Sequence, residues 1–265
     1  MNPYFDLTRE FNQGGLRVIV SSGQAVVLLR LSIASKDGDW IVRETPDALS
    51  HVRAVLARHG ARYRFGAPLD VRWLRGGWSS HLEFAEGGLR IRTDFVSRPP
   101  RLPADELSSL WKEQEGAELP CVDPRRLVLL KMTGRERDYP MIGEIARLIP
   151  AAPDRLLASR SPSDLVSMAE EHPSLARELL HRRPLLEHAL SGSSDALEGA
   201  LDAERRSLMR ADVQRVAAYL AAARGWATLW PSLDRRLAGL PLEAAHAEMV
   251  ERATGVLPYG AEAPG

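Results

Sequence analysis

The sequence has a single cysteine, no net charge and no long apolar run, and each of these absences excludes a class of protein. With Cys121 alone, neither an intrachain disulfide nor a cysteine-based zinc site can form, which favours a reducing compartment. Basic and acidic residues both number 35, so no global attraction to a polyanion is expected. No stretch reaches the length of a membrane span, and the first residues lack the pattern of a signal peptide. We therefore expect a cytoplasmic protein without membrane contact.

The hydrophobic patterning predicts a mixed α/β (α+β) chain. Residues 16–20, 40–42, 69–74, 81–84 and 89–96 read as strands, with helices between them and up to residue 150. From Pro153 onward the pattern is helical throughout and is interrupted only at prolines and short polar turns. We expect a domain at 1–150 with a small mixed sheet flanked by helices, an α-helical domain at 151–257, and a flexible tail at 258–265.

Residues 18–42 contain the most informative pattern. An apolar strand ends at the small residues Ser22 and Gly23, a helix is predicted after them, and Asp37-Gly38-Asp39 then leads into a second strand. A small-residue turn before a helix leaves backbone N–H groups free for phosphate oxygens. Carboxylates two residues apart on a strand share a face and can hold a hard cation. The pattern indicates a triphosphate site, although Asp-Gly is also common in solvated turns.

These residues resemble the signature of the nucleotidyltransferase superfamily, which has the DNA-polymerase-β-like fold. In this resemblance Ser22-Gly23 stands for the glycine pair, thirteen residues intervene, and Asp37 and Asp39 form the carboxylate pair. Asp94, between Thr93 and Phe95 on a later predicted strand, matches the third carboxylate. The helix start at Asp123-Pro124, followed by Lys131 and Asp138, resembles small prokaryotic members of toxin–antitoxin and abortive-infection systems. The resemblance covers about residues 5 to 150.

The resemblance implies an enzyme that moves a nucleoside monophosphate from an NTP to an acceptor hydroxyl on RNA, protein or a small molecule. It implies that Asp37, Asp39 and Asp94 bind Mg²⁺ or Mn²⁺ and that Asp94 takes the acceptor proton. Ser22, Gly23 and Lys131 would bind the triphosphate, and the helical domain would select the acceptor.

A non-catalytic binding protein of the same fold, such as an antitoxin-like or regulatory partner, is the alternative. It is favoured by two departures from the family pattern, Ser22 in place of glycine and Gly38 in place of an apolar residue. Asp94 then serves as an outward partner for a neighbouring arginine. Lys131, on the apolar face of its helix, then extends past the helix end to solvent.

Overall fold

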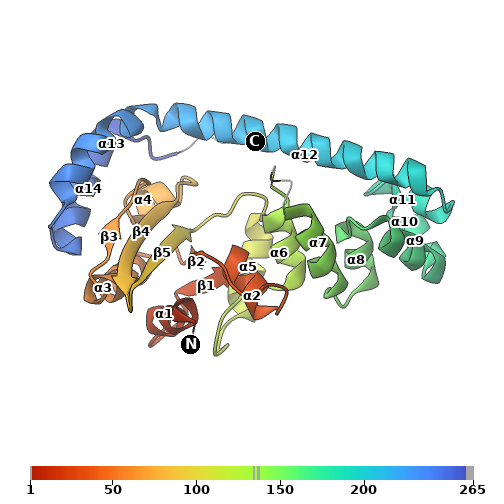
Figure 1. Ribbon diagram of the computed structural model, residues 1–265, viewed down its shortest axis with the longest axis horizontal. Helices are drawn as coiled ribbons and strands as arrows, with labels where there is room; N and C mark the ends of the chain where they lie inside the picture. The colour runs from red at the N-terminus through yellow and green to blue at the C-terminus, as the bar shows by residue number, and fades with distance from the viewer. Residues whose placement is uncertain (1, 134, 136–137, 261–265) are drawn as a thin grey trace. The chain divides into compact units, whose positions relative to one another are not determined.

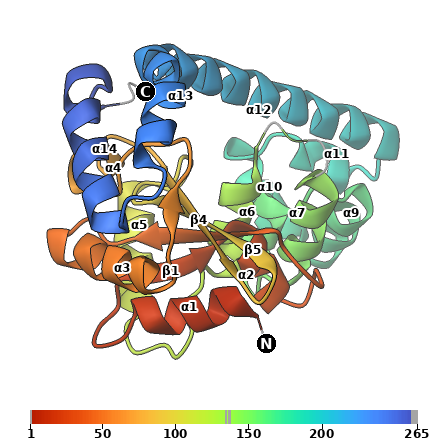
Figure 2. The ribbon, with the colours of Figure 1, turned by 60° about the vertical axis from the view of Figure 1, so that its left-hand side comes forward.

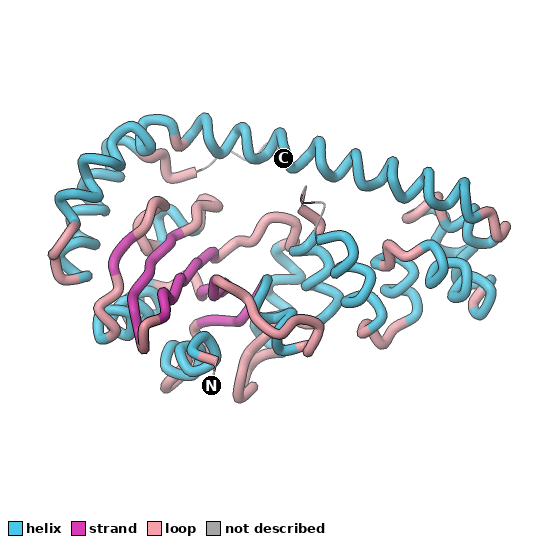
Figure 3. Tube along the Cα trace, in the orientation of Figure 1, coloured by secondary structure: helices cyan, strands magenta, loops and turns pink. Residues whose placement is uncertain are grey.

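The computed structural model describes residues 2–133, 135 and 138–260, and it forms two compact units. The sheet unit comprises residues 1–122 and 215–265, and the helical unit comprises residues 123–214. Helix α12 (Ser194–Ala222) runs through the boundary between residues 214 and 215. In the described part of the chain every strand belongs to the sheet unit (Figure 3). The predicted fold class, a mixed α+β chain with a helical C-terminal region, is confirmed.

The sheet unit is built on five strands in the order β1-β2-β5-β4-β3 (Figure 1). Only the central pair, β2 with β5, is parallel, and all other neighbours are antiparallel. The strand bounds are β1 Val18–Ser21, β2 Asp37–Val42, β3 Arg62–Tyr63, β4 Ser80–Glu86 and β5 Leu89–Val96. Gly87 and Gly88 both have positive φ and form the β4–β5 hairpin, as the glycine pair in the sequence predicts.

Helix α1 (Pro3–Phe11) lies along one face of this sheet (Figure 2). Its aromatic side chains meet those of the strands. The Trp40 ring stacks on Phe95 with centroids 5.4 Å apart, and Phe11 meets both rings edge-on. Trp40 is fully buried and its Nε1 donates a hydrogen bond to Thr8 Oγ1 at 2.9 Å. Trp40 is therefore a core residue of the α1 face. Side chains alternate along a strand, so Asp39 and Asp94 lie on the opposite face.

Among the remaining helices of the sheet unit, α3 and α4 begin at side-chain caps that are visible in the sequence. Thr45 caps α3 by accepting from the N–H of Ala48, and Pro46 occupies its first turn. Their bounds are α2 Ser22–Leu28, α3 Pro46–Arg58, α4 Val71–Leu74, α5 Ala104–Glu113, α13 Arg224–Leu237 and α14 Leu242–Val256. The strand predicted at 69–74 is wrong. Asp70 caps a helical turn there instead, and this turn buries Trp73 and Leu74.

The C-terminal helices α13 and α14 belong to the sheet unit. His246 of α14 is hydrogen-bonded through Nδ1 to the Tyr63 hydroxyl at 2.7 Å, and Trp226 Nε1 of α13 donates to the Gly66 carbonyl at 2.9 Å. Trp78 Nε1 donates to the Pro258 carbonyl at 2.8 Å. The division therefore differs from the predicted boundary near residue 150. Of the predicted flexible tail, residues 258–260 pack on the sheet unit, and 261–265 lie outside the described residues.

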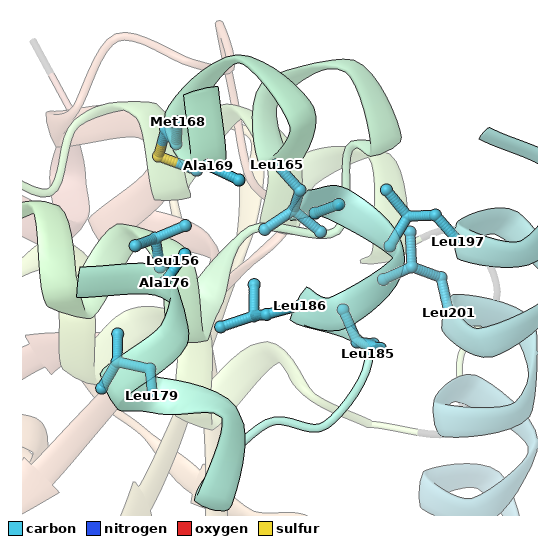
Figure 4. Packing of buried hydrophobic residues seen from close by; sticks show 11 residues of the cluster. Leu156, Leu165, Met168, Ala169, Ala176, Leu179, Leu185, Leu186, Leu197 and Leu201 are labelled. Carbon is cyan, nitrogen blue, oxygen red and sulfur yellow. The ribbon is translucent and has the colours of Figure 1, made fainter. Parts of the chain in front are cut away.

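The helical unit has its own hydrophobic core of leucines, alanines and a methionine. Figure 4 shows Leu197 and Leu201 of α12 pointing toward Leu165, Leu185 and Leu186 of the neighbouring segments. The elements of this unit besides α12 are α6 Pro124–Lys131, α7 Asp138–Arg147, α8 Ala152–Ala158, α9 Pro162–Glu171, α10 Pro173–Glu178, η1 Leu179–His181 and α11 Leu186–Leu190. Within the residues that the structure describes, no helix combines the length and hydrophobicity required to cross a bilayer.

Candidate functional site

Two rows of polar side chains cross the sheet on the face opposite α1. Residues paired directly across strands share a face, so the pairing register assigns each row without ambiguity. The carboxylate row contains Ser21, Asp39, Asp94 and His81 on strands β1, β2, β5 and β4, and it continues to Arg64 directly after β3. The ion-pair row is offset from it by two residues on each strand and contains Asp37, Arg92, Glu83 and Arg62. The i, i+2 spacing of Asp37 and Asp39 places both on this face.

The ion-pair row alternates in sign, and its members neutralise one another. Arg92 Nη1 lies 3.5 Å from Asp37 Oδ1, and Arg62 Nη2 lies 2.7 Å from Glu83 Oε1. Glu83 is almost fully buried and also receives two hydrogen bonds from Arg90, at 2.8 and 2.9 Å. Such paired charges hold the strands in register and explain the arginines of β5 structurally.

The carboxylate row differs because two like charges stand side by side. Asp39 of β2 is paired in register with Asp94 of β5, on the two parallel strands at the centre of the sheet. Like charges at directly opposed positions repel, so this arrangement destabilises the sheet unless cations compensate it. The chain places two partners beside Asp94: His81 Nδ1 lies 2.7 Å from Asp94 Oδ1, and the Arg64 guanidinium, through Nη1, lies 3.6 Å from the same oxygen.

His81 and Ser79 are the residues that sequence reasoning missed. Ser79 Oγ lies 2.8 Å from His81 Nε2, so a hydroxyl, an imidazole and the Asp94 carboxylate form one connected line. No short motif joins them, because Asp94 is thirteen positions from His81 and meets it only through the β4–β5 register. A signal was present in the sequence: Ser79, directly before β4, and His81 are two positions apart, and extended chain of this spacing places them on one side.

Gly38 is required by packing on the α1 face. A Cβ at this position would overlap the rings of Trp40 and Tyr4, so the absence of a side chain leaves room for the two aromatic residues. The departure from the family pattern at Gly38 is therefore explained by the aromatic core of this protein, not by loss of a site. Ser22, the other departure, has φ of 52°, in the left-handed region where glycine is usual.

Ser22 and Gly23 follow Ser21, the β1 member of the carboxylate row, and begin the seven-residue helix α2. Gly23 packs so closely against Ser35 that a Cβ there would overlap the Ser35 hydroxyl. The buried Gln24 is a further residue that sequence reasoning missed. Its amide donates to the carbonyls of Ser35 and Asp37 at 3.2 and 3.1 Å. Gln24 thus holds the segment that leads into β2 at the start of α2.

Lys131, the sequence-predicted triphosphate ligand, is the last residue of α6 in the helical unit. Its side chain is mostly buried, with 15% exposure, and its Nζ lies 3.7 Å from Asp138 Oδ1. The interpretation in which Lys131 extends to bulk solvent is wrong. Its charge is compensated inside its own unit by Asp138, which also accepts a hydrogen bond from Thr133 Oγ1 at 2.9 Å.

The described side chains form no ready-made cage for a divalent cation. Among the described residues, no three histidine, cysteine, aspartate or glutamate side chains stand close enough to enclose an ion as they are arranged. Mg²⁺ commonly takes only one or two carboxylates and completes its shell with water and substrate phosphates. Asp39 and Asp94 provide such a pair, and the buried Asp37 Oδ1 accepts no hydrogen bond from the described part of the chain. The carboxylate row therefore fits a metal–phosphate complex, not an all-protein metal cage.

Comparison with known proteins gives limited information. No family model matches the chain, and no match to a curated protein sequence was found. Among solved structures, a crystal structure of a "putative nucleotidyltransferase" from H. pylori aligns with 78% of this chain and 96% of that chain, at 11% sequence identity and a TM-score of 0.40. At this level of similarity the match carries no functional argument. The function must be argued from the two polar rows.

Proposed function

We propose that the chain is a metal-dependent nucleotidyltransferase that moves a nucleoside monophosphate from an NTP to an acceptor hydroxyl. The single observation that carries this proposal is the side-by-side placement of Asp39 and Asp94 on the central parallel strands. A sheet gains nothing in stability from adjacent like charges, whereas Mg²⁺ bound to a triphosphate is commonly held by one or two carboxylates.

Each residue of the proposed site has a separate role. Asp37, Asp39 and Asp94 would hold Mg²⁺ or Mn²⁺, which neutralises phosphate charge and makes the α-phosphoryl group more electrophilic. When the acceptor is an external molecule, Asp94 takes the proton of its attacking hydroxyl, and the backbone at Ser22 and Gly23 contacts the triphosphate. Lys131 remains a proposed phosphate ligand. The helical unit is proposed to select the acceptor, which is RNA, protein or a small molecule.

The experiment combines binding and turnover. The purified chain is incubated with each α-labelled NTP, Mg²⁺ or Mn²⁺, and total RNA or protein, and label transfer is followed. Asp39→Asn combined with Asp94→Asn should abolish transfer, because both central carboxylates lose their charge. Asp47→Asn is the matched control, since Asp47 is an exposed carboxylate of α3 in the same unit. Transfer that survives in the double variant would contradict the proposal.

Lys131 is tested by isothermal titration with NTP and Mg²⁺. Lys131→Met alone leaves Asp138, which is 13% exposed, without its cation, so it is combined with Asp138→Asn. If Lys131 holds phosphate, the double variant should bind NTP more weakly by about 1.5–3 kcal/mol, roughly 10- to 150-fold. Asp138→Asn alone is the control. Equal NTP affinity in wild type, Asp138→Asn and the double variant would show that Lys131 does not bind phosphate.

A second candidate, a binding protein of this fold without catalysis, is favoured by one observation. Arg92 lies beside Asp37, and Arg64 and His81 lie beside Asp94, so arginine guanidinium groups already stand against these two carboxylates. Such a protein would serve as an antitoxin-like or regulatory partner. It would show no Mg²⁺-dependent NTP binding at millimolar ligand, and that result would replace the enzyme with the binding protein.

A further inference from the structure

The geometry points to Ser79 as a nucleophile: we propose that Ser79, with His81 and Asp94, accepts the nucleotidyl group on the chain itself. This inference rests on the proposed function, because it names the acceptor hydroxyl of the same reaction. It starts from the connected line Ser79 Oγ, His81, Asp94, with distances of 2.8 and 2.7 Å between successive partners. All three residues are in the sheet unit and all remain partly exposed.

The direction of the hydrogen bonds in this line follows from the donor inventory. An ionised carboxylate only accepts, so His81 Nδ1–H donates to Asp94. In a neutral imidazole the other nitrogen then accepts, and Ser79 O–H donates to His81 Nε2. This is the arrangement that activates a serine: a base within reach of the hydroxyl, oriented by a third group. Tyr219 OH, 3.3 Å from Ser79 Oγ, is placed to donate to the same oxygen.

The backbone holds Ser79 and His81 in this arrangement. The N–H of Ala67 donates to the Ser79 carbonyl at 2.9 Å, and the N–H of Arg64 donates to the His81 carbonyl at 2.8 Å. Between them, Gly66 passes so close to the His81 ring that a Cβ would lie 2.6 Å from its Cδ2 atom. The imidazole is thus fixed from one side by a glycine and from the other by Asp94. A serine on a mobile surface loop has no such constraints.

The surroundings favour a phosphoryl group over an acyl group as the electrophile. Arg64 Nη1 lies 3.6 Å from Asp94 Oδ1, yet this buried nitrogen makes no hydrogen bond to the described residues. A guanidinium adjacent to the line supplies positive charge, which favours a charged phosphate group over an uncharged ester. Asp94 also connects the line to Asp39, its neighbour in the carboxylate row.

The step balances without a further reactant. Ser79 Oγ attacks the α-phosphorus of the NTP, and its proton passes to His81 Nε2. The bond between the α-phosphorus and the oxygen bridging to the β-phosphate breaks, and pyrophosphate leaves. The product is a phosphodiester between Ser79 and the nucleoside monophosphate, with Asp94 stabilising the imidazolium.

The test is self-labelling of the full chain with each α-labelled NTP and Mg²⁺, without added acceptor, followed by mass spectrometry of the peptides. We expect one nucleotidyl group on Ser79 and stoichiometric pyrophosphate. Ser79→Ala should abolish labelling, Ser79→Thr should retain a slower reaction, and His81→Gln should slow it by about 10²- to 10⁴-fold, the usual contribution of a general base. Ser50→Ala, which replaces an exposed hydroxyl on α3, is the matched control. Thermal unfolding of each variant verifies that it is folded.

The outcomes separate this inference from the proposed function. Label on added RNA or protein, with none on the chain, leaves the transferase in place and overturns the role of Ser79. Equal self-labelling in wild type and Ser79→Ala overturns it as well. If the chain consumes none of the NTPs, the proposed function is wrong, and so is the inference that rests on it. Acylation of Ser79 by an activated ester such as p-nitrophenyl acetate, without reaction toward NTP, would assign the line to acyl chemistry and overturn nucleotidyl transfer.

Discussion

His246 makes the stability of the sheet unit sensitive to acid. Burial lowers the pKa of His246 from 6.5 to about 4, with a further contribution from Arg53 in the same direction. Its Nδ1 lies 2.7 Å from the Tyr63 hydroxyl, which also accepts from the N–H of Leu69, and the neutral imidazole that burial favours can accept the hydroxyl proton. The folded state thus requires a neutral imidazole.

The sign of the effect follows from linkage. Because the pKa is lower in the folded state, the unfolded chain binds more protons between about pH 6.5 and pH 4, so the free energy of unfolding falls as the pH falls through this window. One pKa unit corresponds to 1.36 kcal/mol, so acidification from pH 7.5 to pH 5 should remove about 2 kcal/mol through His246 alone. Above about pH 6.5, the pKa of His246 in the unfolded chain, neutral His246 contributes its full stabilisation.

Urea denaturation followed by tryptophan fluorescence measures this effect, because all six tryptophans lie in the sheet unit. His246→Asn retains an acceptor for the Tyr63 hydroxyl but cannot be protonated. The pH dependence of the unfolding free energy should therefore be about 2 kcal/mol smaller in this variant between pH 7.5 and pH 5. His181→Asn, at an exposed histidine of the helical unit, is the control. Identical pH dependence in wild type and His246→Asn would refute the reasoning.

Three further predictions concern packing and backbone strain. Gly38→Ala should lower the unfolding free energy by about 1–3 kcal/mol in the fluorescence assay, because its Cβ overlaps the Trp40 and Tyr4 rings; no loss would show that the α1 face yields easily. Ser22→Gly should raise the free energy of unfolding by up to about 1 kcal/mol, because glycine adopts a positive φ without penalty and this gain is only partly offset by the larger entropy of glycine in the unfolded chain. A lower free energy of unfolding would indicate that the serine side chain is needed. Leu186→Ala opens a cavity in the core shown in Figure 4 and should lower the free energy of unfolding, measured by circular dichroism, by about 2–5 kcal/mol. Leu148→Ala, at an exposed leucine, should change it little, and equal effects of the two substitutions would contradict the assigned core.

Local physical chemistry was sufficient to predict most elements. Thr45-Pro46 and Asp123-Pro124 carry an N-cap and a first-turn proline, so the starts of α3 and α6 could be read directly. The spacing of Asp37 and Asp39 placed both on one face, because side chains alternate along any strand. At residues 69–74 the same alternation misled, since the Asp70 cap and the burial of both Trp73 and Leu74 select a helical turn.

Tertiary structure alone decided the pairings between distant segments. Asp39 faces Asp94, and His81 faces Asp94, only because β5 lies between β2 and β4 in the sheet. Local propensity carries no information on strand order, so the line from Ser79 to Asp94 could not be read from the sequence. The return of α14 to the sheet through His246 and Tyr63 has the same origin: a contact across 183 positions depends on complementary burial, which no local pattern encodes.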